Sequence, residues 1–238
     1  MATCTESQRT QWEEKGYLVF DNAIQGEDLA RLQRAFDYWA NQCKSDWLTR
    51  VEAGDAVSTF YDIPGVFEKD EIFVDLVDHP SYYPTLKAVT NGEVIFMSPQ
   101  ARTVPAWPVT YSGWHPDVPH SHPLHIKVQV YVNDVEPKCG EFAFVPGSHK
   151  PDAGPYSKVH RLESMPGHKT FPGGAGTAIM FNSYGWHAAM DNPTGTPRKS
   201  VILIYEKYTP NRVSPGAHAS IAHFCTTPER RRLFSLGE

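Results

Sequence analysis

Ile126-Lys127-Val128-Gln129-Val130-Tyr131-Val132 is the stretch that most clearly predicts the fold, because aliphatic residues occupy every second position. Side chains of a strand point alternately to its two faces, so the aliphatic residues share one face while Lys127, Gln129 and Tyr131 share the other. We expect a β-strand whose aliphatic face packs outward against a cover and whose other face looks into a barrel. A shift by one residue in register would exchange the two faces.

The segments around this strand extend the same prediction. Further short strands are expected over residues 17–20, 94–97, 142–145, 177–181 and 201–205, separated by turn residues. Apolar residues at helical spacing predict a helix over 26–42, and two more helical stretches are expected over 70–90 with Pro80 as a first helical residue. Helices followed by many short strands indicate a mainly β fold, a double-stranded β-helix (jelly roll, cupin-like) with an N-terminal helical cover.

The length of 238 residues suits one domain spanning 1–238. We expect a helical cover over about 8–90, a jelly-roll core over about 92–209 and a C-terminal tail over 210–238. Residues 44–70 have weak periodicity and predict loop with short helix. The long connection 146–176 is more typical of a lid than of a linker.

Composition narrows the classes of function. The net charge of −5 gives no reason to expect nucleic acid or an acidic membrane surface as a partner. No apolar run approaches the length of a membrane span, and the N-terminus has no basic region followed by an apolar stretch, so a cytoplasmic protein is expected. The four cysteines form no C-x-x-C pair, which favours free thiols.

A candidate metal site is indicated by the stretch Trp114-His115-Pro116-Asp117-Val118-Pro119. His115 and Asp117 are two positions apart, so they point the same way from an extended backbone and could grip one metal ion. With the distant His187 they would form the two-histidine, one-carboxylate facial triad that suits Fe(II) and leaves coordination positions open. Arg198 follows shortly after, and a guanidinium is well shaped to hold a carboxylate, here the distal one of 2-oxoglutarate. An H-x-D triplet alone is a weak signal in a chain with 11 histidines.

Other segments make the pattern more specific. Three further segments accompany the H-x-D triplet, the distal histidine and the arginine. They are Gly140-Glu141-Phe142-Ala143-Phe144-Val145-Pro146-Gly147-Ser148-His149-Lys150, the pair Asn133-Asp134 before it, and Trp12 to Phe20 near the start. Over roughly residues 10–208 the chain resembles the phytanoyl-CoA dioxygenase (PhyH) family of Fe(II)/2-oxoglutarate oxygenases in all these segments.

The resemblance implies an enzyme that uses Fe(II), 2-oxoglutarate and O2. It implies oxidation, above all hydroxylation, of an unactivated C–H bond of a small molecule, with CO2 and succinate as co-products. An iron halogenase is not expected, because those enzymes have a small residue where Asp117 stands.

The inward face of the first strand and the aromatic residues near the ligands complete the expected site. Ser200 is expected to assist Arg198 from the same strand face, and Gln129 and Lys127 to face the cofactors. Lys127 either meets an anionic primary substrate or helps Arg198 hold 2-oxoglutarate. Candidate substrate contacts are Lys127, Tyr131, Trp114 and Tyr111, and Trp107 and Trp186 could also wall the pocket. A small polar or anionic substrate is therefore expected.

Three alternatives stay open at this stage. His120, His122 and His125 crowd the loop after His115 and could form a second metal site, although the flanking prolines make a solvent-facing loop the simpler account. A 2-oxoglutarate-independent cupin-type oxygenase or isomerase could use the same ligands but would not need Arg198. A non-catalytic jelly-roll binding module would need neither.

Overall fold

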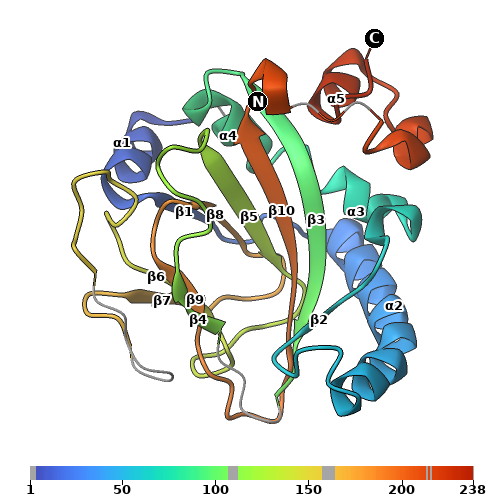
Figure 1. The fold of residues 1–238 in the computed structure, drawn as a ribbon. Coiled ribbons are helices and arrows are strands. Elements are labelled where there is room, and N and C mark those ends of the chain that lie inside the picture. The colour runs from blue at the N-terminus through green and yellow to red at the C-terminus, as the bar shows by residue number, and fades with distance from the viewer. Residues whose placement is uncertain (1–3, 107–111, 157–163, 213, 215, 238) are drawn as a thin grey trace.

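Two antiparallel sheets form the framework of the computed structural model, which describes residues 4–106, 112–156, 164–212, 214 and 216–237 (Figure 1). The large sheet has the strand order β1-β8-β5-β10-β3-β2 and the small sheet β4-β9-β6-β7. The large-sheet strands are β1 (Tyr17–Phe20), β2 (Tyr61–Asp62), β3 (Val94–Val104), β5 (His125–Tyr131), β8 (Ala178–Asn182) and β10 (Arg198–Lys207). The small-sheet strands are β4 (Ser112–His115), β6 (Phe142–Phe144), β7 (Lys169–Phe171) and β9 (His187–Ala189). The jelly-roll prediction is confirmed.

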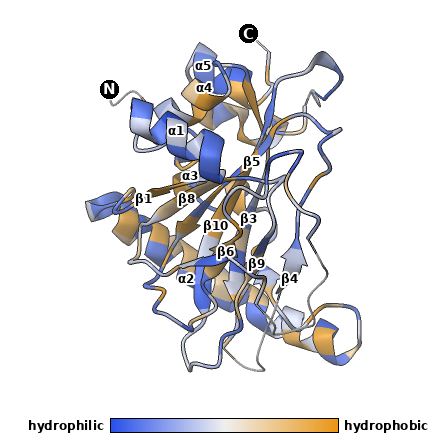
Figure 2. Cartoon of the chain, turned by 90° about the vertical axis from the view of Figure 1, so that its left-hand side faces the viewer, coloured by the Kyte–Doolittle hydropathy of each residue, from blue (hydrophilic) through white to orange (hydrophobic). Residues whose placement is uncertain are grey.

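Helices cover the outer face of the large sheet, and Figure 1 shows α2 and α3 beside its β2–β3 edge. The helical elements are α1 (Glu6–Lys15), α2 (Gly26–Glu52), η1 (Val66–Glu68), α3 (Glu71–Asp75), α4 (Tyr83–Val89), η2 (Pro210–Arg212), η3 (Ala219–Phe224) and α5 (Pro228–Leu233). Figure 2 shows hydrophobic and hydrophilic residues together on α2, whereas α1 is largely hydrophilic. No helix in the described part of the chain is both long and apolar enough to cross a membrane.

Strand β5 has the two faces that its alternation predicts. Ile126, Val128 and Val130 belong to the main hydrophobic core together with residues of α2, α3 and α4. Lys127 and Gln129 instead line a cavity between the two sheets. The register of β5 is held on both sides, because it pairs with β10 and with β8. The inner face of β5 is therefore available to a functional site.

The helical cover differs from the prediction at several boundaries. Helix α2 continues ten residues past Gln42, to Glu52, and buries Trp47, because Ala40, Cys43, Trp47 and Val51 prolong its apolar stripe. Residues 53–70 then hold β2 and η1. Pro80 does not begin a helix: α4 starts at Tyr83, with Pro84 in its first turn.

Strand β3 is longer than predicted and runs through Pro99, which was expected in a loop. Pro99 lies opposite Leu203 of β10, while β2 pairs with β3 only at Thr103 and Arg102. On the side of β3 that faces β2, no pairing reaches Pro99. The N–H that proline lacks therefore costs no hydrogen bond to β2. Strands β4, β7 and β9 were not predicted.

The expected division into cover, core and tail is too simple. Strands β1 and β2 lie within 8–90, yet they form the two edges of the large sheet. Residues 210–238 were expected to be a tail, but Ile221, Leu233 and Phe234 are buried in the main core. The connection 146–176 contributes β7 and also Met165, which packs on the outer face of the small sheet.

Candidate functional site

Three predicted metal ligands meet where β4 and β9 of the small sheet pair. His115 ends β4 and lies opposite His187, the first residue of β9. Asp117 follows β4, and its backbone N–H donates to the carbonyl of Ser183 at 2.9 Å. One ligand atom from each of His115, Asp117 and His187 lies within 4.8 Å of the other two. Among the described residues this is the one group of His, Cys, Asp or Glu side chains that could hold a metal.

Both imidazoles are oriented by the backbone. Nδ1 of His115 is 2.6 Å from the carbonyl of Gly113, and Nδ1 of His187 is 3.0 Å from the carbonyl of Gly185. A carbonyl can only accept, so each Nδ1 carries the proton and each Nε2 keeps a free lone pair. These Nε2 atoms lie 3.9 Å and 3.5 Å from the carboxylate of Asp117. Two imidazole nitrogens and one carboxylate oxygen are the donor set of non-haem Fe(II).

The surroundings of His187 and Asp117 favour the protonation states in which these two side chains bind a metal. Burial lowers the pKa of His187 to about 4 although Asp117 opposes the shift, so this imidazole stays neutral at physiological pH. For Asp117, burial raises the pKa, but His187, Lys127 and His115 together lower it below its ordinary value. A neutral histidine beside an ionised carboxylate is what a divalent metal requires.

Arg198, at the start of β10, is a buried cation without a carboxylate partner among the described residues. Its side chain is 3% exposed, and Nη1 donates to the carbonyl of Gly140 at 2.8 Å. Its Nε is buried with no hydrogen-bond partner. Burial lowers the pKa of Arg198, although nearby Tyr131 and Glu141 oppose that shift. Ser200, two positions along, is fully buried, and its Oγ also lacks a partner.

The cavity that holds these groups has a volume of about 190 Å³. Its polar lining includes Lys127 and Gln129 of β5, as predicted, and Gln100 and Arg102 of β3, which were not predicted. Phe142, Phe181, Ile202, Ala188 and Ala189 supply the apolar part. Gln100 and Arg102 were missed because β3 was expected to end at Met97. The charge of Arg102 is balanced, since its guanidinium makes two bonds of 2.8 and 2.7 Å to Asp62.

Several aromatic residues that were expected to line the pocket do not. Trp114 precedes His115 in β4 and therefore faces the other side of the small sheet, where it packs with Val145 and Ala188. Trp186 lies against the same outer cluster. Tyr131 is on the inner face, but it is completely buried, and its hydroxyl donates to the carbonyl of Phe171 at 2.8 Å.

Lys127 has a different partner from the two that the sequence suggested. Its Nζ lies 2.6 Å from Oδ1 of Asp117, so its counter-charge is a predicted metal ligand and not a substrate anion. Asp117 can contact both Lys127 and a metal, because a carboxylate has two oxygens. Of the other candidate residues, Tyr111 and Trp107 lie outside the described part of the chain.

Two of the crowded histidines after His115, His120 and His122, have structural partners, whereas the buried Nδ1 of His125 has no hydrogen-bond partner among the described residues. His120 Nε2 is 2.9 Å from the carbonyl of His149, and His122 lies 3.5 Å from Glu206, which Arg212 also contacts. His125 is buried, and burial lowers its pKa to about 4. The second metal site is not formed by these residues.

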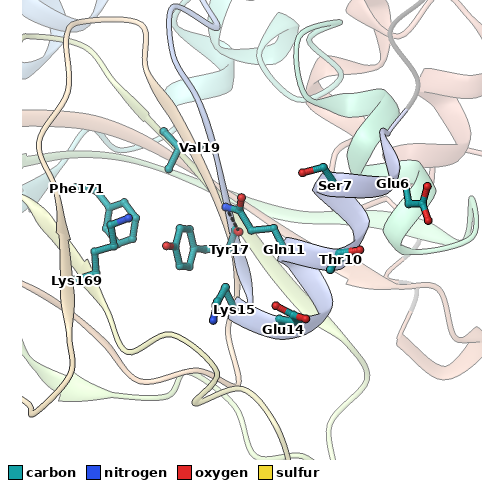
Figure 3. A pocket seen from close by; sticks show the side chains of 10 residues that line it. All are labelled: Glu6, Ser7, Thr10, Gln11, Glu14, Lys15, Tyr17, Val19, Lys169 and Phe171. Atoms are coloured by element: carbon teal, nitrogen blue, oxygen red, sulfur yellow. Dashed lines mark hydrogen bonds between the residues drawn. The ribbon is translucent and has the colours of Figure 1, made fainter.

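A larger cavity of about 800 Å³ lies elsewhere, between α1, β1 and β7 (Figure 3). It is lined by Glu6, Glu14, Lys15 and Lys169 among others, and Gln11 Nε2 donates across it to the carbonyl of Tyr17 at 3.2 Å. It shares no residue with the triad cavity. Size alone therefore does not identify the functional site.

Comparison with known proteins identifies the family of this chain. The profile of the phytanoyl-CoA dioxygenase (PhyH) family matches residues 12–200. The ectoine dioxygenase of Nocardia farcinica is 20% identical over 242 residues, which cover 88% of this chain and 80% of that protein.

Two solved structures share the fold. HygX from Streptomyces hygroscopicus, with nickel and 2-oxoglutarate bound, has a TM-score of 0.66 at 14% identity, covering 89% of this chain and 90% of that one. The alpha ketoglutarate dependent carbocyclase SnoK from nogalamycin biosynthesis has a TM-score of 0.64 at 15% identity, covering 85% and 84%. Because the family match spans most of the sequence, the chain belongs to the phytanoyl-CoA dioxygenase family and is an Fe(II)/2-oxoglutarate-dependent dioxygenase.

Proposed function

We propose that His115, Asp117 and His187 hold the Fe(II) of this dioxygenase and that it hydroxylates a C–H bond of a small polar substrate. The observation that carries the metal assignment is the convergence of the three ligand atoms within 4.8 Å. The backbone carbonyls that fix both Nδ1 atoms support it, since they leave each Nε2 free for the metal. Bound Fe(II) with 2-oxoglutarate supplies the oxidising power, with succinate and CO2 as co-products.

Arg198 is proposed to bind the distal carboxylate of 2-oxoglutarate. Three buried polar atoms without hydrogen-bond partners lie on the inner face of neighbouring strands: Arg198 Nε, Ser200 Oγ and Gln129 Nε2. Leaving such groups unsatisfied costs free energy. A bound carboxylate would accept from the guanidinium in the two-bond geometry that arginine favours. Nη1 already donates to Gly140, which fixes the orientation of the fork.

The proposed substrate is small and polar. A cavity of about 190 Å³ leaves little room beside 2-oxoglutarate, and its walls include Gln100, Gln129 and Arg102. With Lys127 paired to Asp117, the support for a polar substrate rests on the β3 and β5 side chains and on size. Two relatives are ectoine dioxygenases, from Nocardia farcinica and Streptomyces coelicolor. Ectoine is therefore the first compound to test.

The test begins with anaerobic addition of Fe(II) and 2-oxoglutarate to the metal-free protein. A weak visible charge-transfer band should appear only when both are present, and His187→Ala should abolish it together with stoichiometric iron binding. Succinate formation is then measured in air with a panel of small polar compounds, ectoine first, and the oxidised product is identified by mass spectrometry. Unchanged iron binding in His187→Ala would rule out this ligand set.

A further inference from the structure

Lys127 is the one lysine that lines the triad cavity among the described residues. It comes from the centre of β5, and its side chain is 13% exposed. Its Nζ lies 2.6 Å from Oδ1 of Asp117, and no other described acceptor takes a hydrogen bond from it. An ammonium placed this deeply would be costly without such a partner. The ion pair between Lys127 and Asp117 is therefore an integral part of the site.

The two oxygens of Asp117 have different surroundings. Oδ1 accepts from Lys127, whereas Oδ2 is buried without a hydrogen-bond partner. Oδ2 is also the oxygen that lies 3.5 Å from Nε2 of His187. Lys127 thus occupies Oδ1, which also lies 3.9 Å from Nε2 of His115, while Oδ2 stays free of hydrogen bonds beside His187.

We propose that Lys127 is a positioning residue that restricts Asp117 to binding the metal through one oxygen, Oδ2. The inference rests on the proposed metal site. A carboxylate is able to bind a metal through one or both oxygens, and binding through both would use a coordination position. The facial triad serves its chemistry only if positions stay open for the 2-oxo acid and O2. By holding Oδ1, Lys127 keeps those positions free.

This role differs from direct contact with 2-oxoglutarate. A lysine that touches 2-oxoglutarate changes the affinity for that cofactor but has no effect before it is added. A lysine that positions Asp117 changes the metal environment even when the metal is the only ligand. The metal-only state therefore separates the two roles.

The experiment uses Co(II) as a spectroscopic substitute for Fe(II), because its visible bands depend strongly on coordination number. Spectra of the wild-type protein, Lys127→Met and Lys127→Arg are recorded with Co(II) alone and then during titration with 2-oxoglutarate. Gln100→Leu is the matched control, since Gln100 lines the same cavity without a hydrogen bond to a ligand. Melting curves of every variant verify folding, and Lys127→Gln replaces the methionine variant if that one does not fold.

We expect the Co(II)-only spectrum to change in Lys127→Met, to be retained in Lys127→Arg and to be unaffected in Gln100→Leu. The dissociation constant for 2-oxoglutarate should rise by on the order of tenfold in Lys127→Met. A Co(II)-only spectrum that is identical in wild type and Lys127→Met would overturn the positioning role, even if 2-oxoglutarate binds less tightly. Failure of the wild-type protein to bind one Co(II) would instead overturn the proposed metal site.

Discussion

Among the described residues that line the cavity, Arg198 is the buried cation whose positive charge is least compensated by the protein. A guanidinium that is 3% exposed, with one carbonyl partner and a buried free Nε, is poorly compensated by the protein. Arg102 offers a contrast within the same cavity, because Asp62 already occupies two of its nitrogens. The anion therefore belongs at Arg198.

Arg198 is expected to set the affinity of the protein for 2-oxoglutarate. Arg198→Ala should weaken 2-oxoglutarate binding on the order of a hundredfold, because a charge-assisted bidentate pair is lost. Arg198→Lys should restore little, since an ammonium is not a planar fork. Steady-state KM for 2-oxoglutarate is the measurement. Lys199→Ala is the control, because Lys199 pairs with Asp37 on the outside of the sheet. A KM that is unchanged in Arg198→Ala would place the anchor elsewhere.

His125 makes the stability of the metal-free protein depend on pH. Burial lowers its pKa to about 4, while Asp117 and Glu206 oppose the shift and Lys127 and His122 assist it. Between the unfolded pKa of about 6.5 and the folded value, the unfolded chain binds more protons, so stability falls as pH decreases through this window. The full shift corresponds to about 3 kcal/mol. Urea unfolding at pH 7 and pH 5 should show a smaller difference in His125→Gln, and an equal difference would exclude His125 as a cause.

The helices and strands that were predicted correctly are those whose hydrophobic pattern lies within the element itself. The alternation in β5 predicted both faces of that strand. The motif residues predicted that His115, Asp117 and His187 lie together, and the structure brings these three side chains together. The same alternation rule places Trp114 outside, next to His115 in β4, so the prediction that it lines the pocket was wrong for a reason visible in the sequence.

Other elements depend on partners that are distant in sequence. Strands β4, β7 and β9 are too short to show a period, and each exists because it pairs within the small sheet. The cavity residues Gln100 and Arg102 were missed because β3 reaches them only by pairing along the whole of β10. Helix α1, in contrast, begins with a capping box between Thr5 and Gln8 that the sequence contains.

One hydrophobic core joins the helical cover, the outer face of the large sheet and the C-terminal segment. Arg230 of α5 links this last segment to α3 and the turn after it, through bonds of 2.9 and 2.6 Å to Asp78 and 3.0 Å to Asp75. Residues 219–234 therefore pack on β3 and η1 and complete the hydrophobic core there. They contribute to stability without entering the cavity.

Phe234 provides the test of this view. Its side chain is fully buried and its ring lies 5.2 Å from that of Phe96 in β3 and 5.9 Å from that of Phe67 in η1. Phe234→Ala should lower the free energy of unfolding by roughly 3–5 kcal/mol, because it removes apolar burial and leaves a cavity. Urea unfolding measures the loss, and Tyr208→Ala, at a residue that is 46% exposed, is the control. Since Phe234 does not line the triad cavity, the KM for 2-oxoglutarate of the folded variant should stay at the wild-type value. A loss below about 0.5 kcal/mol, the size of an ordinary surface substitution, would mean that residues 210–238 are a tail after all.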